Sequence, residues 1–210
     1  MKAYKLNLEI IIAAVGVFSL IIFSLVLIIF HIAGVETLGG IVLSYGYIIA
    51  PTGLLWILSD KYLWHTKLFQ IVHKPLNIPP DLRGRWEGTL ENADGSEPQK
   101  FVIEVKQTLT SLSVHSFSSI GYSISIVPEI TSSHNEENFT LCYLWHGQIN
   151  ASIKDIHQIE QFYGYTMLHL HEHESPKILK GLYFTNRISS QTRGGIQLTW
   201  VSHKLKRKLE

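Results

Sequence analysis

The order of apolar and polar residues changes completely near residue 80. Before that point two long runs contain no charged residue, Ile10–Phe30 with twenty-one residues and Thr37–Ser59 with twenty-three. At helical rise, each run is long enough to cross the roughly 30 Å hydrocarbon core of a bilayer. Residues 1–60 are therefore predicted to form two transmembrane helices joined by a short turn.

The charges beside the two runs predict the orientation of this hairpin. Lys2 and Lys5 precede the first run and Lys61 follows the second, whereas residues 31–36 between them contain no Lys or Arg. Under the positive-inside rule both termini are cytoplasmic and the short turn is periplasmic. A cleaved signal peptide is the alternative for the first run, but the run is longer than the apolar region of an ordinary signal peptide.

Small residues in the second run indicate close helix packing. Gly40 and Ser44 lie four residues apart, as do Gly46 and Ala50. Small residues at this spacing let helix backbones approach closely inside a membrane. The contacts they favour lie either within one hairpin or between copies of the chain.

Residues 61–80 form a linker between the hairpin and the rest of the chain. Aromatic and aliphatic residues recur there at helix-like spacing with Lys between them, which predicts an interfacial helix. Pro75, Pro79 and Pro80 then end any helix and begin an extended segment.

Residues 81–210 alternate between apolar and polar positions at the period of a β-strand. Turn sequences such as Asn92–Gly95 and Arg193–Gly195 separate most of the predicted strands, and residues 151–160 have a short helical pattern. The eight predicted strands are roughly 83–91, 99–108, 110–117, 121–128, 138–149, 162–173, 178–187 and 194–204. This order favours an up-and-down antiparallel barrel, because closure leaves no exposed edge.

The first predicted strand opens with Gly84-Arg85-Trp86, the Gly-x-Trp sequence of lipocalin-like barrels. In such barrels the Trp fills the floor, so Trp86 is predicted to be structural. Alternation places Leu90 on the same inner face as Trp86, with Phe101 opposite, and both are expected to be core. An eight-stranded barrel still has room for one small ligand.

One predicted strand carries a candidate phosphate contact. Tyr183, Thr185 and Arg187 alternate there, and the Arg187 guanidinium can hold a phosphate bidentately. Leu182 and Phe184 on the opposite face are also apolar, so the inward face of this strand stays open.

Aromatic residues on two other strands are candidate base contacts. Tyr143 and Trp145 alternate on one strand and Tyr122 opens another. Rings in such positions stack on nucleic bases. The alternative for each of them is an ordinary place in the core.

Three histidines, His169, His171 and His173, share one face of a predicted strand. Two histidines at this spacing are a known metal-binding arrangement. Leu168 and Leu170 make the opposite face the better core face, however, so the histidines are expected outside and no metal site is predicted.

Composition excludes several classes of function. A net charge of +1 provides no large basic surface for DNA or RNA. The chain has no recognisable nucleophile–base pair, phosphate loop or carboxylate pair, so neither enzymatic activity nor a cofactor is expected. The single cysteine, Cys142, leaves no intrachain disulfide and agrees with a reducing compartment.

Two N-terminal spans, a proline-bounded linker and an eight-stranded barrel resemble the two-transmembrane, β-strand-rich effectors of bacterial CBASS anti-phage systems. The resemblance rests on this architecture and on the stretch Leu82–Gly88. It implies that a partner nucleotidyltransferase makes a cyclic oligonucleotide and that the barrel binds a cyclic dinucleotide as its activating ligand. It further implies that the effector then oligomerises, disrupts the bacterial inner membrane and kills the cell.

Two other functions remain open from the sequence. One is a membrane-tethered, lipocalin-like carrier of an apolar small molecule, which a chiefly aliphatic lumen would favour. The abundant Tyr, Ser, Thr and His of the predicted strands argue against it. The other is an adaptor whose barrel docks a second protein.

Overall fold

The computed structural model describes residues 8–32, 49–66, 78–132, 139–149, 161–171, 174–186 and 191–209. The chain divides into two compact units. One is formed by Leu6–Ile78, and the other contains Pro79–Glu210. The division falls next to Pro79 and Pro80, which were predicted to end the linker.

The first unit is helical wherever it is described. Helix α1 (Leu8–Ile32) contains 25 residues, and helical structure is present again over 49–58. A π-helical turn, η1 (Ser59–Leu63), follows. The Trp64 N–H donates a 3.2 Å hydrogen bond to the Ser59 carbonyl, which closes this turn. None of the helices, over the residues described, combines the length and the apolar character required to cross a membrane.

Most of the residues predicted to pack the hairpin fall outside the described part of the chain. Gly40, Ser44 and Gly46 belong to this group, and Ala50 is exposed on the helical segment. The predicted interfacial helix is described only as far as residue 66. The two-helix hairpin therefore remains a prediction from the sequence.

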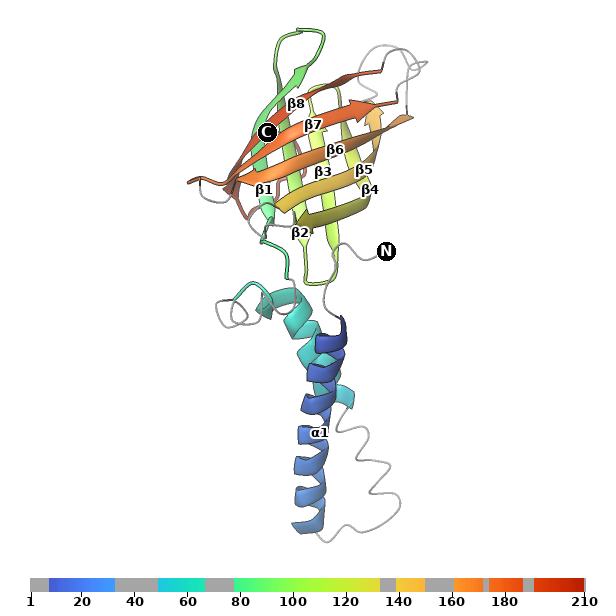
Figure 1. The fold of residues 1–210 in the computed structure, drawn as a ribbon, viewed down its shortest axis with the longest axis vertical. Coiled ribbons are helices and arrows are strands. Elements are labelled where there is room, and N and C mark those ends of the chain that lie inside the picture. Colours follow the sequence, from blue (N-terminus) through green and yellow to red (C-terminus); the bar gives the residue numbers. More distant parts are fainter. Residues whose placement is uncertain are drawn as a thin grey trace. The chain divides into compact units, whose positions relative to one another are not determined.

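All eight predicted strands are present, and they close into one antiparallel barrel (Figure 1). Their bounds are β1 (Gly84–Asn92), β2 (Gln99–Gln107), β3 (Leu112–Ser118), β4 (Gly121–Ser132), β5 (Phe139–Ile149), β6 (Gln161–His171), β7 (Ile178–Thr185) and β8 (Arg193–Ser202). Each strand pairs with its sequence neighbour, and β1 pairs with β8. The predicted eight-stranded antiparallel barrel is confirmed.

The inner face follows the predicted alternation at the start of the barrel. Trp86 pairs with Ile103 and Gly88 with Phe101. Trp86 and Ile103 are fully buried. These residues lie inside because successive side chains of a strand point to opposite faces of the sheet.

The end of the barrel at Trp86 is closed. The Trp86 Nε1–H donates a 2.9 Å hydrogen bond to the Leu82 carbonyl, and both residues are almost inaccessible to solvent. The Gln107 side chain accepts from the Leu82 N–H at 2.9 Å and donates to the Pro80 carbonyl at 3.0 Å. The entering chain is thus fastened beneath the barrel, and Trp86 occupies the predicted floor position.

The outer face of β1 and β2 is covered by the C-terminal segment. Arg85 is fully buried, and its guanidinium donates to Glu104 at 2.9 Å and to the Lys208 and Leu209 carbonyls at 2.7 Å. Glu104 in turn accepts from the Lys206 N–H at 2.7 Å. Two buried charges therefore hold the last residues of the chain against the barrel wall.

The predicted turn at Arg193–Gly195 is wrong, because these residues belong to β8. Gly194 pairs with Asn92 of β1, and a Cβ at Gly194 would lie 1.8 Å from the Glu91 carbonyl oxygen. The glycine therefore permits a close approach between strands where the barrel closes.

Candidate ligand-binding site

A cavity lies inside the barrel at the end opposite Trp86. Its uncharged polar lining consists of Asn92, Gln99, Ser116, Ser118, Tyr122, Ser123, Gln148, Thr166, Tyr183, Thr185 and Thr192. Its apolar lining includes Leu90, Phe101, Ile120, Trp145, Ile149, Phe162 and Ile196. Asn92 and Thr185 are the last residues of β1 and β7, so the cavity opens where these strands end.

The cavity is small inside and wide at its mouth. Its volume is about 170 Å³, or about 840 Å³ when the solvent-open space around its mouth is included. A dry apolar cavity of about 150 Å³ holds one benzene ring. The inner space thus suits one planar ring system, and a larger ligand extends into the mouth.

One wall of the cavity is a fixed aromatic surface. The Trp145 and Phe162 rings meet edge to face, with centroids 5.6 Å apart and planes at 80°. The Trp145 Nε1–H donates a 2.9 Å hydrogen bond to Thr166 Oγ1. Gly164 has no side chain to displace the indole, since a Cβ there would lie 2.2 Å from Trp145 Cζ2. Contacts at the ring edge, the nitrogen and the ring face therefore determine where Trp145 lies.

Hydroxyl groups gather at the inner level of the cavity. Tyr143, Thr166 and Tyr183 are successive cross-strand partners on β5, β6 and β7, and Ser116 pairs with Ser123 across β3 and β4. All five side chains are buried. A hydroxyl both donates and accepts a hydrogen bond, so this level can satisfy either kind of polar ligand atom.

Two of these buried hydroxyls have no partner in hydrogen-bonding geometry, Ser116 Oγ and Tyr143 OH. Burial raises the pKa of Tyr143 above its ordinary value of 10.0, while the nearby hydroxyls of Ser116 and Thr166 act in the opposite direction. These hydroxyls are therefore close to Tyr143 without completing its hydrogen bond. Buried polar groups without a partner are uncommon and mark places where a further polar atom fits.

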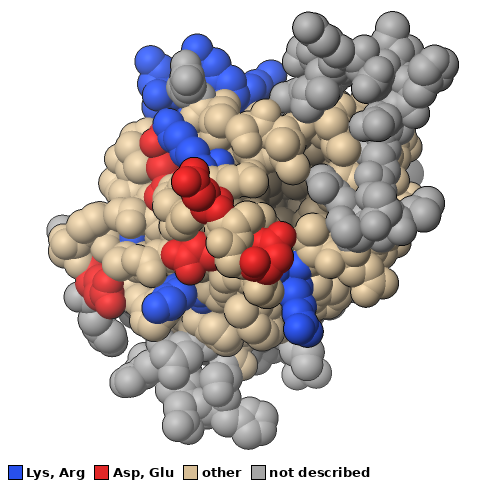
Figure 2. Space-filling view, turned by 90° about the horizontal axis from the view of Figure 1, so that it is seen from above, with Lys and Arg blue, Asp and Glu red and all other residues tan. Residues whose placement is uncertain are grey.

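Polar pairs surround the mouth. Thr185 Oγ1 and Thr192 Oγ1 share a 2.8 Å hydrogen bond, and the Tyr183 hydroxyl hydrogen-bonds Asn92 Oδ1. Tyr122 OH donates to Gln148 Oε1 at 2.8 Å. Seen from above, this face of the barrel is mostly uncharged, with Asp and Glu near its middle and Lys and Arg beside and around them (Figure 2).

The structure brings four of the predicted ligand residues together around the cavity: Tyr122, Trp145, Tyr183 and Thr185. Tyr183 and Thr185 are buried, whereas Leu182 and Phe184 are exposed, which decides the inward face of β7. The other two predicted residues, Tyr143 and Arg187, are not among the described lining residues.

Tyr143 is 1% exposed and is not a lining residue, although its hydroxyl lies close to two that line the cavity. Arg187 lies outside the described residues. The structure thus provides no placement for the predicted phosphate contact.

Sequence reasoning missed several lining residues. Leu90 and Phe101 were expected to be core, and they line the cavity as well. Ser116 and Thr166 were not singled out, although each alternates with buried apolar residues, Val114 in one case and Leu168 in the other. A polar residue in phase with a buried apolar face is the sequence signal by which Ser116 and Thr166 could have been found.

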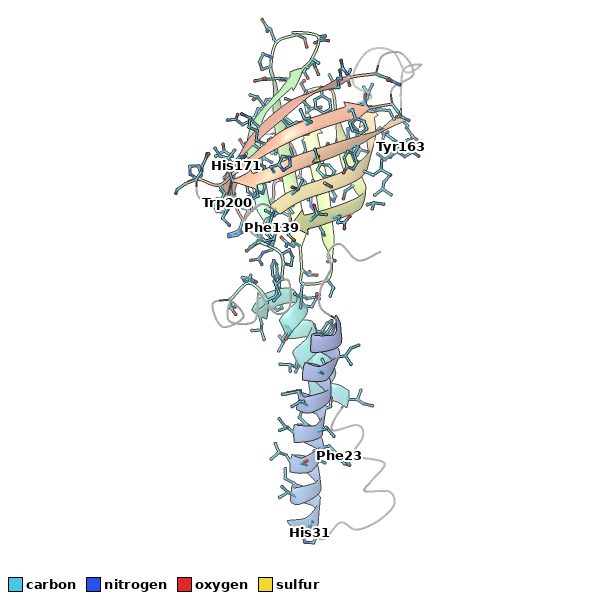
Figure 3. The ribbon with its side chains drawn as sticks, viewed as in Figure 1. Phe23, His31, Phe139, Tyr163, His171 and Trp200 are labelled. Atoms are coloured by element: carbon cyan, nitrogen blue, oxygen red, sulfur yellow. The ribbon has the colours of Figure 1, made fainter. Side chains whose placement is uncertain are left out.

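The histidines of β6 lie on the outside. Leu168 and Leu170 are buried, and His169 and His171 are exposed, with His171 at the end of the strand opposite Tyr163 (Figure 3). Thr140 Oγ1 and His169 Nδ1 are 3.0 Å apart. In the part of the chain that the structure describes, His, Cys, Asp and Glu form no group suited to a metal ion.

A closed antiparallel barrel with a Trp floor and one open, uncharged cavity defines a class of small-molecule-binding barrels. The family model described as Cap15, cyclic dinucleotide receptor domain, matches residues 77–200, which is more than half of the chain. The chain therefore belongs to the Cap15 cyclic dinucleotide receptor family. No curated protein matches it.

Proposed function

We propose that the barrel cavity binds a cyclic dinucleotide and that the chain is a CBASS effector activated by this ligand. One observation carries the proposal: the match to the receptor domain, residues 77–200, spans the strands that enclose the cavity. In this proposal the cyclic dinucleotide is made by a partner nucleotidyltransferase. No further cofactor is required.

The chemistry of the cavity supports a nucleotide ligand. Trp145 and Phe162 provide aromatic surface on which a base can stack, at about 1–3 kcal/mol per base. Hydroxyl and amide groups alternate with that surface around the lining. A carrier of aliphatic molecules needs few such groups, and buried polar groups facing an apolar ligand destabilise its complex.

We place the membrane contact of this effector in the N-terminal hairpin. The uncharged runs of residues 10–30 and 37–59 support two spans in the bacterial inner membrane, with both termini in the cytoplasm. Residues 37–48 of the second run, and several side chains of the first, are outside the described part of the structure. A cytoplasmic barrel then meets a ligand made in the same compartment.

Ligand binding is proposed to act by promoting assembly of several chains. A ligand shifts such an equilibrium only by its differential affinity for the assembled state. Small residues of the second run, from Gly40 to Ala50, support contacts between hairpins. Exposed apolar side chains on the outer faces of β5 and β7, Leu144, Leu182 and Phe184, support contacts between barrels. The outcome is disruption of the inner membrane and death of the infected cell.

Calorimetric titration of the full-length protein in detergent micelles tests the ligand class. The panel contains cyclic dinucleotides, the corresponding linear dinucleotides and a long-chain fatty acid. We expect binding of a cyclic dinucleotide, weakened by about 1–3 kcal/mol in Trp145→Leu through the loss of one stacking surface. The matched control is Tyr163→Leu on the outer face of β6, which should bind as the unaltered protein does. Binding of the fatty acid alone would identify the apolar carrier instead.

A further inference from the structure

The interior of the cavity is suited to a base and not to a phosphate. The described lining contains no Lys, Arg or His. Burying a phosphate away from water without a cation is strongly unfavourable. An uncharged aromatic base, in contrast, gains from contact with the Trp145 and Phe162 rings. The charged part of the ligand therefore belongs at the mouth, where water reaches it.

The size of the cavity limits how much of the ligand enters. Its volume of about 170 Å³ is close to that of a cavity holding one six-membered ring, about 150 Å³. A cyclic dinucleotide carries two bases on one rigid sugar–phosphate ring. One base fits inside, and the second remains outside.

The hydroxyls of Ser116 and Tyr143 are the groups available to form hydrogen bonds with the inserted base. Ser116 lines the cavity, is 3% exposed and has no partner for its Oγ. The Tyr143 hydroxyl is also buried without a partner and lies close to those of Ser116 and Thr166. A base edge that supplies polar atoms to this group removes the cost of leaving it unsatisfied.

Resting on the function proposed above, we propose that the cavity holds one base of the cyclic dinucleotide and leaves the other at the mouth. The plane of the inserted base lies against Trp145, and its edge faces Ser116 in the cavity lining, with the Tyr143 hydroxyl close beside it. The second base and both phosphates remain near Tyr122 and Thr185, whose hydroxyls are already paired with Gln148 and Thr192. Specificity for base identity then comes from one base only.

Ligands with altered bases test whether one base is read. The starting compound is the cyclic dinucleotide with two identical bases that the full-length protein in detergent binds most tightly. Unsubstituted purine, which lacks exocyclic groups, replaces one base or both. Replacing one base should weaken binding only about twofold, because half of the binding orientations remain productive. Replacing both should weaken it about tenfold, the cost of losing the edge contacts.

Two substitutions that each remove a single oxygen identify the reading residues, Ser116→Ala and Tyr143→Phe. Their matched controls are Ser113→Ala on the outer face of β3 and Tyr163→Phe on that of β6. Each test variant should bind the unaltered ligand about tenfold more weakly and should lose little further affinity for the doubly replaced ligand. The controls should behave as the unaltered protein does.

The possible failures are distinguishable. If the unaltered protein binds no cyclic dinucleotide, both the proposed function and this inference are overturned. If it binds, but replacing one base costs as much as replacing both, the single-base cavity is wrong while the proposed function stands. If Ser116→Ala and Tyr143→Phe bind all ligands as their controls do, these hydroxyls do not read the base.

Discussion

The aromatic wall of the cavity depends on two glycines as well as on its aromatic rings. Gly164 and Gly147 lie on the inner face beside Trp145, and a Cβ at either position would come within 2.2 Å and 2.8 Å of the indole. The hydrogen bond to Thr166 then fixes the rotation of the ring. A ring held in this way loses little conformational entropy when a base stacks on it.

Substitution of Gly164 tests whether the position of Trp145 matters for binding. In Gly164→Ala the new methyl group displaces the indole, so we expect about tenfold or greater loss of ligand affinity, corresponding to one stacked base. Titration calorimetry measures the change. Gly195→Ala is the matched control, because the nearest atom to its Cβ is 4.0 Å away. Equal affinity in the two variants would show that the indole position is unimportant.

Tyr165 on the outer face of β6 has an unusual acid–base property. Its hydrogen bond with Cys142, together with burial and the nearby Cys142 and Glu129 charges, raises the pKa of Tyr165 to about 12 from its ordinary value of 10.0. Because the folded pKa is the higher one, the stabilisation is complete below about pH 10 and is lost as the pH rises toward 12.

Ultraviolet titration of tyrosinate checks this value, with the Tyr165→Phe variant identifying the signal among the nine tyrosines. Cys142→Ala should move the titration back toward 10, whereas Cys142→Ser, which keeps a hydrogen-bonding atom, should move it less. A Tyr165 titration near 10 in the unaltered protein would contradict the contact.

At the residue scale the sequence predicted ring positions better than polar ones. Alternation made Trp145 and Tyr183 candidates for the inner face, and both are buried, although the sequence left the inward face of the Tyr183 strand open. It did not single out Ser116, because serine is common on both faces of strands, and its phase with Val114 becomes informative only once the closed barrel shows which face lines a cavity. The role of Gly164 depends on a cross-strand neighbour, which no local pattern reveals.

Among the elements, the C-terminal segment is held by an ion pair that water does not reach. Arg85 and Glu104 are 0% and 2% exposed, and the backbone of residues 206–209 completes their hydrogen bonds. Glu87 contributes a further contact to Arg85 at 2.5 Å, and the hydrogen bond from Arg85 lowers the pKa of the Glu87 carboxyl. Removing one member of such a group leaves the other charge buried alone.

Glu104→Ala should therefore lower the free energy of unfolding by about 3–5 kcal/mol. Asp81→Ala is the control: its ion pair with Arg83 is partly exposed, so a loss of about 1 kcal/mol or less is expected. Chemical denaturation of the full-length protein in detergent, followed by tryptophan fluorescence, measures both. Equal losses would mean that burial does not distinguish the two pairs.

The strands could be predicted from the sequence because the period-two pattern is strong and one face of each strand is buried. The ends of the strands are harder to predict: β4 continues to Ser132, and β8 begins with glycines that by composition predict a turn. Gly194 is a turn residue by composition, but it serves the approach of β1, which is a contact between the two ends of the barrel sequence. The cover formed by residues 206–209 likewise depends on tertiary contacts.

The whole molecule combines a barrel with one closed end and one open end. The entering chain is fastened at the closed end by Gln107, and the cavity opens at the other. A ligand in the mouth would therefore lie at the end of the strands opposite the entering chain. Under the function proposed above, such a ligand acts through contacts between barrels and leaves the hydrogen bonds of the entering chain in place.

At this scale the alternating pattern and the two uncharged runs divided the chain near residue 80, and the family match begins at residue 77. The barrel followed from sequential strands with short connections. The hairpin, its orientation and its assembly rest on sequence alone. These three properties depend on interactions with lipid and with other copies of the chain, and the structure is that of one chain alone.

Dye release from vesicles tests the central claim most directly. The full-length protein is reconstituted into dye-filled vesicles of phosphatidylethanolamine and phosphatidylglycerol, and the cyclic dinucleotide that binds it is added outside. We predict release that begins near the dissociation constant of the ligand and requires proportionally more ligand in Trp145→Leu but not in Ser113→Ala. Release that is the same with and without ligand, or no release when the ligand is bound, would contradict the account.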